Sequence, residues 1–502
     1  MNLRKSTAAL PEAPARGWAP RLAQERRLKE LDAQLARQAG DTISLEIERA
    51  ALLGALNRHQ DAQQAFVGIL RRAPTHFSAL NEFGNLLTRM GLIEAACRVY
   101  AEAILHHPDN PLARVNLANL LLRATRYAEA RAHYEHALEA DPDHAEAHQG
   151  LGAVLADLGD RDGARDHFRR GFRGHAISTL PYRGEGPPTR LLQLVSSGGG
   201  NIPSGLILDD ARFLTTVVVA DHFDLQTPLP PHQLIFNAIG DADLCEPALQ
   251  AAARIVATAN VPVINDPRAI MKTGRIGNSE RLRGIAGVRT ARTVAIARHR
   301  LAGSGGAGAL ARQGYSYPLL LRSPGYHTGR NFILVETAAD LPSAAQSLPG
   351  EELLAIEYLD ARGCDGKARK FRVMMIGGKL YPLHLAISKS WKVHYFTSDM
   401  ADQPDHRAEE VKFLEDMPGT LGAKAMRALE AIQSALGLDY AGIDFGLAGD
   451  GGLLLFEANA TMVVAKPGPE AHWAYRRRAI DRVLEAAVAM LSEKATPGAM
   501  RA

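Results

Sequence analysis

The chain has 502 residues, enough for roughly two to four domains with a large apolar core. Hydrophobic residues make up 46% and charged residues 23%, which is ordinary for a globular protein. The net charge of +3 is too small to indicate a nucleic-acid partner. Cys97, Cys245 and Cys364 are far apart and form neither a zinc motif nor a disulfide framework. With no membrane-length apolar run and no secretory signal, we expect a cytoplasmic protein that does not bind a membrane.

A repeat of 34 residues fills the first third of the chain, after an N-terminal segment (1–42) in which 21–42 is predicted as a solvent-facing helix. A small residue, an aromatic four positions later and a proline eight after that recur at this period. They are Ala62, Ala96, Ala130 and Ala164; Phe66, Tyr100, Tyr134 and Phe168; Pro74, Pro108 and Pro142. The small residue lets two helices approach, the aromatic fills the space between them, and proline ends the second helix. This pattern resembles the tetratricopeptide repeat and predicts an all-α solenoid of four repeats over 43–176.

The first helices of the two middle repeats carry the same polar pair. Asn85 and Arg89 are four residues apart, and Asn119 and Arg123 repeat them 34 residues later. Spacing of four places each pair on one helix face. Such a ladder of donors suits the carbonyls or carboxylates of a bound peptide. The alternative is a solvated polar face, since the outer repeats have Ala51, Ala55, Ala153 and Asp157 there.

The composition changes after the repeats. Residues 177–189 include Gly184-Glu-Gly-Pro-Pro188 and are predicted as a linker. Apolar runs at 191–195, 215–220, 234–238 and 261–264, with a helical run at 248–259, predict an α/β domain over 190–268 with a largely parallel sheet. The glycine-rich segment 196–203 follows the first of these strands, where it is either a ligand-approaching loop or a plain turn.

Two carboxylates and an amide near the C-terminus are the strongest chemical signal. Apolar runs flank the turn sequence at 448–452, which predicts a β-hairpin. With the turn centred between Asp450 and Gly451, Asp444 falls opposite Glu457, and Asn459 shares the face of Glu457. Three oxygen donors on one patch suit Mg²⁺, or Mn²⁺, shared with substrate phosphates. The alternative is a surface hairpin with solvated acids.

The same segment also resembles a known superfamily. Gly442-Ile-Asp-Phe-Gly446 followed by Leu455-Phe-Glu-Ala-Asn-Ala-Thr461 looks like the metal-binding end of ATP-grasp enzymes. That superfamily includes D-alanine–D-alanine ligase, glutathione synthetase and the glutamate ligases that extend a ribosomal protein. The resemblance implies that 190–268 is a Rossmann-like pre-ATP-grasp domain. It also implies an α+β ATP-grasp domain at 269–495, with two subdomains hinged near 357–360, followed by a tail at 496–502.

The resemblance further implies roles for particular residues. Arg281 and Arg322 stand where the superfamily has phosphate-binding lysines, and both changes keep the charge while altering the geometry of phosphate binding. Segment 324–330 matches the glycine-rich loop over the phosphates, where His327 and Arg330 can add contacts. Backbone groups around Glu357, Tyr358 and Leu359 would bind adenine, Asp360 would reach the ribose, and Arg372 would face phosphate or the acyl group. Apart from the resemblance, segment 384–395 gathers two His, two Lys, Trp391 and Tyr395 in a short span. It is either a substrate loop in which Lys389 or His394 touches phosphate or carboxylate, or an exposed basic loop around a buried Trp391.

These expectations combine into one functional hypothesis. It is an ATP- and Mg²⁺-dependent carboxylate–amine ligase that works through an acyl phosphate, with Arg322 and Arg372 as catalytic residues. The repeats would recruit a peptide or protein substrate, and a small amine or carboxylate would be the other partner. The alternatives are an ATP-grasp kinase, or a repeat scaffold whose nucleotide domain binds ATP without catalysis.

Overall fold

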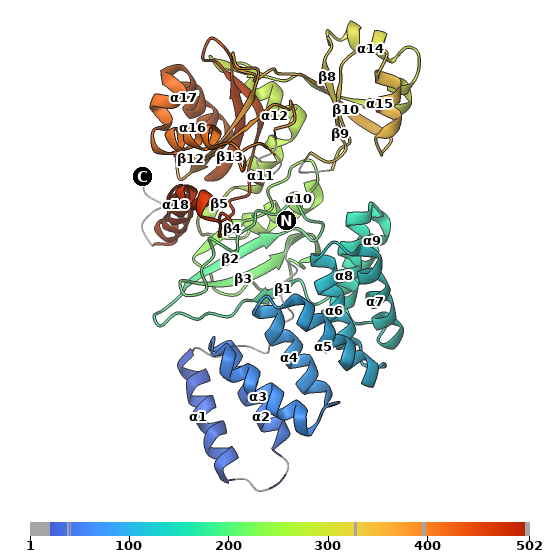
Figure 1. Ribbon diagram of the computed structural model, residues 1–502, viewed down its shortest axis with the longest axis vertical. Coiled ribbons are helices and arrows are strands. Elements are labelled where there is room, and N and C mark those ends of the chain that lie inside the picture. Colours follow the sequence, from blue (N-terminus) through green and yellow to red (C-terminus); the bar gives the residue numbers. More distant parts are fainter. Residues whose placement is uncertain (1–20, 38–39, 41, 326–328, 394–397, 497–502) are drawn as a thin grey trace. The chain divides into compact units, whose positions relative to one another are not determined.

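The computed structural model describes residues 21–37, 40, 42–325, 329–393 and 398–496 (Figure 1). The chain forms two compact units. The first unit lies within residues 1–199 and 208–232, and the second within 200–207 and 233–502. The predicted domain at 190–268 therefore contributes to both units.

The first unit begins with helices that alternate at the predicted period. The leading helix is α1 (Arg21–Arg37), and the first helices of the repeats start 34 residues apart. The repeat helices are α2 (Ile43–Ala55), α3 (His59–Arg72), α4 (Phe77–Arg89), α5 (Ile93–His106), α6 (Pro111–Arg123), α7 (Tyr127–Ala140), α8 (Ala145–Leu158) and α9 (Arg161–Gly171). The four predicted helical hairpins are confirmed.

The small and aromatic residues of the repeat pack as predicted. Phe66, Tyr100, Tyr134 and Phe168 are all buried. A Cβ atom added to Gly84 would come within 2.4 Å of the Tyr100 ring, and one added to Gly150 within 2.2 Å of the Tyr134 ring. The missing side chains therefore allow the close helix contacts.

Helix α1 forms where a solvent-facing helix was predicted, but one side of it is buried. Leu28 and Leu31 are buried, and Leu28 joins the apolar cluster of the first repeat. Arg27 donates to Glu48 on α2 at 2.8 Å. Helix α1 covers an apolar face of the first repeat and acts as its cap.

Three strands complete the first unit. They are β1 (Ile177–Thr179), β2 (Thr189–Val195) and β3 (Phe213–Val219), with the short helix η1 (Ala220–His222) after β3. β2 and β3 pair in parallel, and β1 pairs antiparallel to β3. The predicted linker 177–189 thus contains a strand. Ala176 and Val219 belong to the same apolar cluster as the last three repeats, so strands and repeats share one core.

The second unit starts with a small α/β segment. It consists of β4 (Leu234–Asn237), α10 (Glu246–Ala257), β5 (Val263–Ile264), α11 (Pro267–Ile270), η2 (Met271–Thr273) and α12 (Arg275–Leu282), and β4 and β5 are parallel. The buried Asn265 amide donates to the carbonyl of Tyr440 at 2.8 Å. This bond ties the segment to the C-terminal part of the unit.

An antiparallel sheet with the order β7-β10-β8-β9 forms the next layer. Its strands are β7 (Thr293–Ala297), β8 (Leu319–Arg322), β9 (Phe332–Val335) and β10 (Glu352–Glu357). Helices α13 (Arg298–Ala302), α14 (Gly306–Arg312) and α15 (Leu341–Ser347) contribute to the same apolar cluster as these strands. This lobe therefore has a core of its own.

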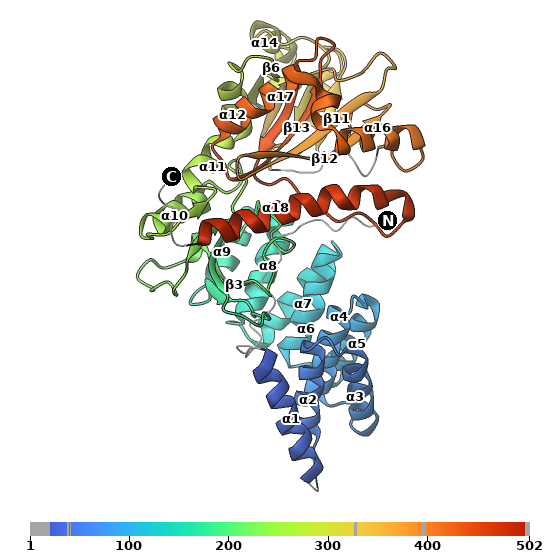
Figure 2. The same ribbon diagram turned by 90° about the vertical axis from the view of Figure 1, so that its left-hand side faces the viewer.

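A second sheet has the order β12-β11-β13-β14-β6. Its strands are β6 (Val288–Thr290), β11 (Ala368–Ile376), β12 (Lys379–Ser388), β13 (Tyr440–Leu447) and β14 (Leu453–Asn459); the helices are α16 (Pro404–Glu415), α17 (Met417–Leu436), η4 (Ala471–Arg476) and α18 (Arg477–Ala495). Helix α18 packs against β11 and β12 (Figure 2). Gly377 and Gly378 form the turn that joins β11 to β12, and both have a positive φ. Within the described ranges, no helix is long and apolar enough to cross a membrane.

Candidate functional site

The register of the β13–β14 hairpin agrees with the sequence at its functional end. Asp444 pairs with Glu457, as predicted. The turn itself is centred one half-residue earlier, because Leu447 pairs with Leu453. A register shift between Asp444 and Phe445 restores the predicted pairing. Such an irregularity re-aims side chains next to it.

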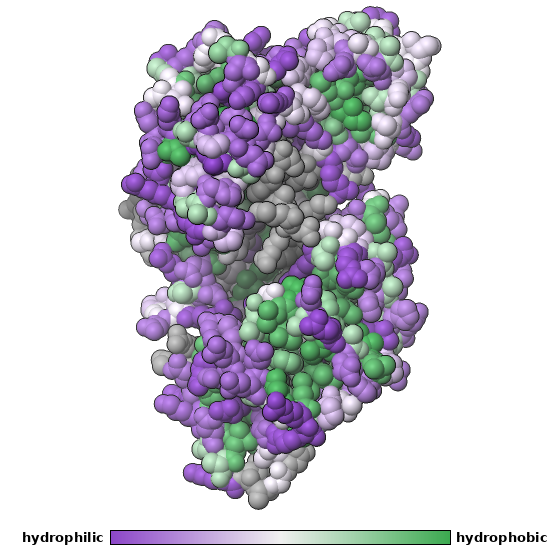
Figure 3. Space-filling model, in the orientation of Figure 1, coloured by the Kyte–Doolittle hydropathy of each residue, from purple (hydrophilic) through white to green (hydrophobic). Residues whose placement is uncertain are grey.

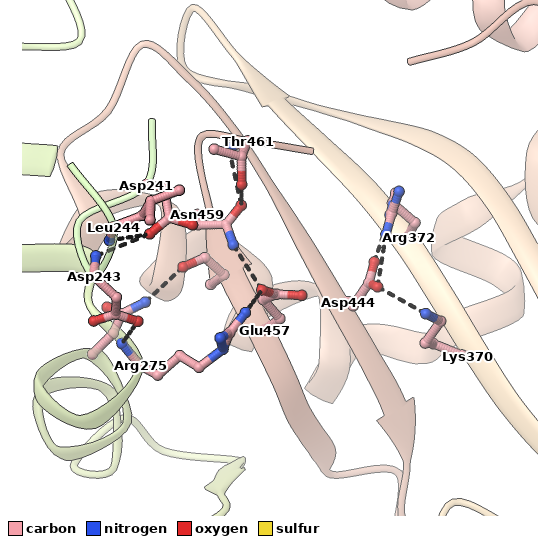
Figure 4. A network of polar contacts seen from close by, with 12 residues as sticks. Asp241, Asp243, Leu244, Arg275, Lys370, Arg372, Asp444, Glu457, Asn459 and Thr461 are labelled. Atoms are coloured by element: carbon pink, nitrogen blue, oxygen red, sulfur yellow. Dashed lines mark hydrogen bonds and ion pairs between the residues drawn. The ribbon is translucent and has the colours of Figure 1, made fainter. Parts of the chain in front are cut away.

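Two cations share the carboxylate of Asp444 (Figure 4). Arg372 donates through Nε at 2.6 Å and through Nη2 at 2.8 Å, and Lys370 Nζ lies 3.0 Å away. All three come from adjacent strands, since Arg372 pairs with Asp444 across β11 and β13. The Asp444 side chain is 4% exposed, and those of Lys370 and Arg372 are 17% and 18% exposed. Burial raises the pKa of Asp444, but the charges of Arg372 and Lys370 outweigh it and hold this pKa below its usual range.

Glu457 has a cation of its own. Arg275, at the start of α12, donates to its Oε1 at 2.9 Å, and the Asn459 amide donates to the same oxygen at 3.0 Å. Burial raises the pKa of Glu457, and the charges of Arg275 and Arg322 bring it below the usual value. Asn459 in turn accepts from the backbone and hydroxyl of Thr461, which fixes the orientation of its amide.

A loop after β4 reaches the same patch. Asp243 accepts from the backbone nitrogen of Arg275 at 3.1 Å, and its pKa is raised by burial. Asp241 caps the loop by accepting from Asp243 and Leu244, each at 2.9 Å. A Cβ atom at Gly274 would come within 2.6 Å of Asp243. The loop is therefore held close to the β14 end of the site (Figure 4).

Arg281 and Arg322, which stand where the superfamily has phosphate-binding lysines, lie in different surroundings. Arg322 ends β8, and its guanidinium group lies 5.6 Å from the centre of the Phe332 ring. Burial and the nearby charge of Arg275 lower the pKa of Arg322 to about 10, partly offset by Glu457. Arg281 instead donates to Asn278 on its own helix, and burial lowers its pKa. Arg322 thus belongs to the electrostatic cluster around Glu457, whereas the recorded contacts of Arg281 stay within α12.

A further group of polar side chains, from β12, α16 and η4, lies near Asp444. His384 on β12 is 6% exposed, and burial with the charges of Arg372 and Arg476 keeps its pKa well below the usual value. Glu410 on α16 is fully buried, forms an ion pair with Arg476 at 3.3 Å and accepts from Tyr475. His384 therefore stays neutral beside two arginines.

The predicted hinge follows β10. Glu357 accepts from the backbone and side chain of Arg292, and Asp360 is exposed and bound to Arg362 at 2.6 Å. Tyr358 and Leu359 between them are half-buried. These contacts hold the segment locally and leave its role in adenine binding a prediction.

Only part of the predicted basic loop lies near Arg322. Trp391 packs edge-on against Phe332 at 5.5 Å, the ring that Arg322 also covers. Lys389 is exposed, and its backbone nitrogen donates to Asp399. His327 and His394 lie outside the described residues.

Sequence reasoning missed Arg275 and Lys370 as partners of the acids. Lys370 had a usable signal, because it precedes Arg372 by two residues, and on a strand that spacing places both side chains on one face. Arg275 had no such signal in the sequence, since its partner Glu457 is 182 positions away.

The oxygen donors of Asp444, Glu457 and Asn459 are chemically suited to a hard divalent cation. It offers carboxylate and amide oxygens of the kind that Mg²⁺ prefers. Both oxygens of Asp444 are engaged by Arg372 and Lys370, and Oε1 of Glu457 by Arg275. No group of three His, Cys, Asp or Glu side chains arranged for a metal occurs among the described residues. A metal ion bound here would need substrate oxygens as further ligands. Lys370, Arg372 and Arg275 would have to turn from the carboxylates toward a bound anion.

On the repeats, the predicted polar ladder has a structural component. The Asn85 carbonyl oxygen accepts from the Tyr100 hydroxyl at 2.7 Å, and that of Asn119 accepts from Tyr134 at 2.5 Å. Arg89 and Arg123 are exposed. Apolar side chains gather on the repeat helices in the view of Figure 3. The larger exposed ones in the repeats are Leu92, Ile93, Leu105 and Leu158.

The helical hairpins of the first unit are tetratricopeptide repeats. This family matches residues 81–134 and 109–174. Residues of this chain are also similar to the TPR repeat-containing thioredoxin TTL4 of Arabidopsis thaliana, at 37% identity over 85 residues, which is 17% of this chain and 12% of that protein. Protein FlbA of Caulobacter vibrioides is 32% identical over 110 residues, 22% of this chain and 18% of its own length. The chain thus matches less than a fifth of the length of these relatives.

Part of the chain is also similar to solved structures. One is MamA 41-end from Desulfovibrio magneticus RS-1, with 21% identity over 30% of this chain and 84% of that one and a TM-score of 0.27. Another is a tetratricopeptide repeat protein from Parabacteroides merdae, with 17% identity over 30% of this chain and 59% of that one and a TM-score of 0.27. The assignment of the repeats rests on the family match and on the helix pattern.

Proposed function

We propose that the protein is an ATP- and Mg²⁺-dependent carboxylate–amine ligase whose repeats recruit a peptide or protein substrate. The observation that carries the proposal is the crowding of two partly buried cations on one acid. Lys370 and Arg372 share the single carboxylate of Asp444, so this end of the site keeps an unneutralised positive charge. Burying such a charge is costly unless an anion compensates it. A polyphosphate is an anion of suitable chemistry.

The layout of the second unit supports the same proposal. One mixed sheet carries Asp444, Glu457 and Asn459, and strand β8 of a second, antiparallel sheet ends in Arg322. The segment after β10 leads from the second sheet into β11. This agrees with the two-subdomain arrangement that the resemblance to ATP-grasp enzymes implies, with a nucleotide bound between the subdomains.

The chemistry needs positioned charge more than a nucleophilic side chain. In the proposed reaction a substrate carboxylate attacks the γ-phosphorus of ATP, which gives an acyl phosphate and ADP. An amine then attacks the acyl carbon, phosphate leaves, and an amide forms with loss of a proton. Arg322 and Arg372 would hold the phosphoryl oxygens and the carboxylate. Glu457, Asn459 and Asp444 would hold Mg²⁺, which supplies charge neutralisation at the phosphates.

Recruitment by the repeats is the second part of the proposal. Tetratricopeptide arrays present extended concave surfaces for binding. Here the exposed Arg89 and Arg123 lie on equivalent positions of α4 and α6, and apolar side chains are exposed on the same solenoid. A solenoid that exposes both guanidinium groups and apolar side chains suits a peptide with acidic and apolar side chains.

The test compares two acids of one hairpin. Glu457→Gln keeps the side-chain shape but removes the charge that would bind Mg²⁺. Asp450→Asn, at the exposed turn, removes a charge that contacts only Lys424 among the described side chains. Calorimetry with ATP and Mg²⁺, followed by an assay of ADP formation, should show loss of both in Glu457→Gln and neither in Asp450→Asn. ATP binding without ADP formation in the unaltered protein would favour the scaffold alternative, and no ATP binding would refute the proposal.

A further inference from the structure

A charged cavity lies in the first unit, apart from the carboxylate cluster of Asp444, Glu457 and Asn459. Its volume is about 380 Å³, and it is lined by Arg169, Arg170, Phe172, Arg173 and His222. The arginines belong to the end of α9 and the residues after it, and His222 follows β3. The cavity therefore lies where the last repeat meets the carboxyl ends of the parallel strands, the edge at which α/β sheets bind ligands.

The wall of the cavity is a rigid aromatic surface. Phe172 is 2% exposed and belongs to the core that joins the repeats to the strands. The His222 ring stacks on it, with the ring centres 5.2 Å apart and the planes inclined by 24°. A planar or apolar group can rest on such a surface.

Hydrogen bonds fix the orientation of His222. The Ser197 hydroxyl donates to Asp221 at 2.6 Å, which uses its one proton. The Nε2 atom of His222 lies 3.2 Å from the same hydroxyl oxygen, so Nε2 is the donor there. The Asp221 carboxylate also accepts from the Ser197 backbone at 3.2 Å, and both its oxygens are thus occupied. Ser197 lies in the glycine-rich segment predicted as a ligand loop.

The arginines at the rim of the cavity carry more positive charge than neighbouring acidic side chains neutralise. Arg169 has only an exposed ion pair with Asp166 at 3.2 Å, of the kind that contributes little. No ion pair or side-chain hydrogen bond joins Arg170 or Arg173 to another described residue, and both are exposed. Guanidinium forks bind carboxylate and phosphate in a bidentate manner.

We propose that this cavity binds a small organic dianion, a phosphomonoester or a dicarboxylate, whose body rests on the His222 ring, which stacks on Phe172, while Arg170 and Arg173 hold its charged oxygens. A volume of about 380 Å³ falls within the usual range for small-molecule sites. The proposal does not depend on the ligase activity, because none of these residues belongs to the carboxylate cluster.

The test uses the full chain and three probes that share a ring: phenyl phosphate, phthalate and the neutral benzamide. Hydrogen exchange is followed in residues 168–175 and 196–199, so that binding at the nucleotide site does not interfere. We expect protection there by phenyl phosphate, phthalate or both, and none by benzamide. Protection by only one anion identifies the phosphoryl or the carboxylate group as the ligand chemistry.

Two variants decide whether the arginines hold the ligand. Arg170→Ala combined with Arg173→Ala should weaken the anion by about tenfold or more, since each removes charge-assisted hydrogen bonds. Arg165→Ala is the control, because Arg165 is an exposed arginine of the same helix whose ion pair is with Asp162 and which does not line the cavity. Equal affinity in the double variant and the control would overturn the proposal and leave the arginines as partners of the helix terminus alone. So would the absence of anion-induced protection in the unaltered protein.

Discussion

The hydroxyl groups of Tyr100 and Tyr134 explain a residue pattern that sequence reasoning assigned to peptide binding. Each hydroxyl donates to an asparagine fifteen residues earlier, Asn85 or Asn119. In the outer repeats the aromatic is phenylalanine, and Ala51 or Ala153 takes the place of asparagine. Asparagine therefore occurs where a buried hydroxyl needs an acceptor. Aligning the four repeats and comparing the asparagine position with the aromatic position could have revealed this coupling.

A double-mutant cycle checks the coupling. Asn119→Ala should destabilise the repeats by about 1–3 kcal/mol, because it leaves the buried Tyr134 hydroxyl without its acceptor. Adding Tyr134→Phe should recover most of that loss, since the pair then matches the outer repeats. Hydrogen exchange of α6 and α7 measures the change locally, which avoids treating the whole chain as two-state. A double variant no more stable than Asn119→Ala would show that the two residues act independently.

Charge at position 322 should matter more than the shape of the group that carries it. Arg322→Lys keeps a cation near Glu457, whereas Arg322→Ala removes it. If the residue binds phosphate, the alanine variant loses about 1.5–3 kcal/mol of ATP binding and the lysine variant less. Calorimetry with ATP and Mg²⁺ measures both. Arg300→Ala, an exposed arginine on α13, is the control. Equal affinity in the lysine and alanine variants would place Arg322 outside the nucleotide site.

At the scale of elements, local patterns predicted the repeat helices, strands of the α/β region and the β13–β14 hairpin. The 34-residue period indicated the helices, and apolar runs around turn residues indicated the hairpin, because these signals come from neighbouring residues. The pairing of Asp444 with Glu457 was predicted correctly although the turn centre was not, since the register shift compensates. The cation partner Arg275 could not be predicted, because long-range packing alone brings it to Glu457.

Two glycine substitutions in the repeat helices should have opposite effects. Gly150→Ala would place a Cβ atom within 2.2 Å of the Tyr134 ring, and overpacking of this kind costs about 1–3 kcal/mol. Gly68→Ala on α3 meets nothing within 4 Å and should stabilise its helix by about 0.5–1 kcal/mol. Thermal unfolding followed by circular dichroism gives the sign of each effect. The same sign in both would contradict the packing argument.

For the whole molecule, the division into units departs from the domains that composition suggested. The predicted linker contains β1, and Ala176 and Val219 pack with the repeats, so the first unit continues to residue 232. Composition located the end of the helical pattern but not the shared core, which depends on contacts between distant residues. A variant that cut the chain near Thr189 would remove β1 from its partner. Point substitutions on the repeats are therefore the sharper probe of their role.

The final prediction separates recruitment from chemistry. Arg89→Ala combined with Arg123→Ala removes the two exposed guanidinium groups of α4 and α6 and leaves Asn85 and Asn119 on their tyrosines. The second unit contains the whole proposed nucleotide site, so ATP binding should be unchanged. Binding and modification of the polypeptide substrate should fall by about tenfold or more for each lost charge-assisted contact. Arg131→Ala is the matched control, because Arg131 is an exposed arginine on α7 that pairs with Glu135. Substrate binding that survives the double substitution would show that the repeats recruit through other residues, while a parallel loss of ATP binding would show that the two units do not act separately.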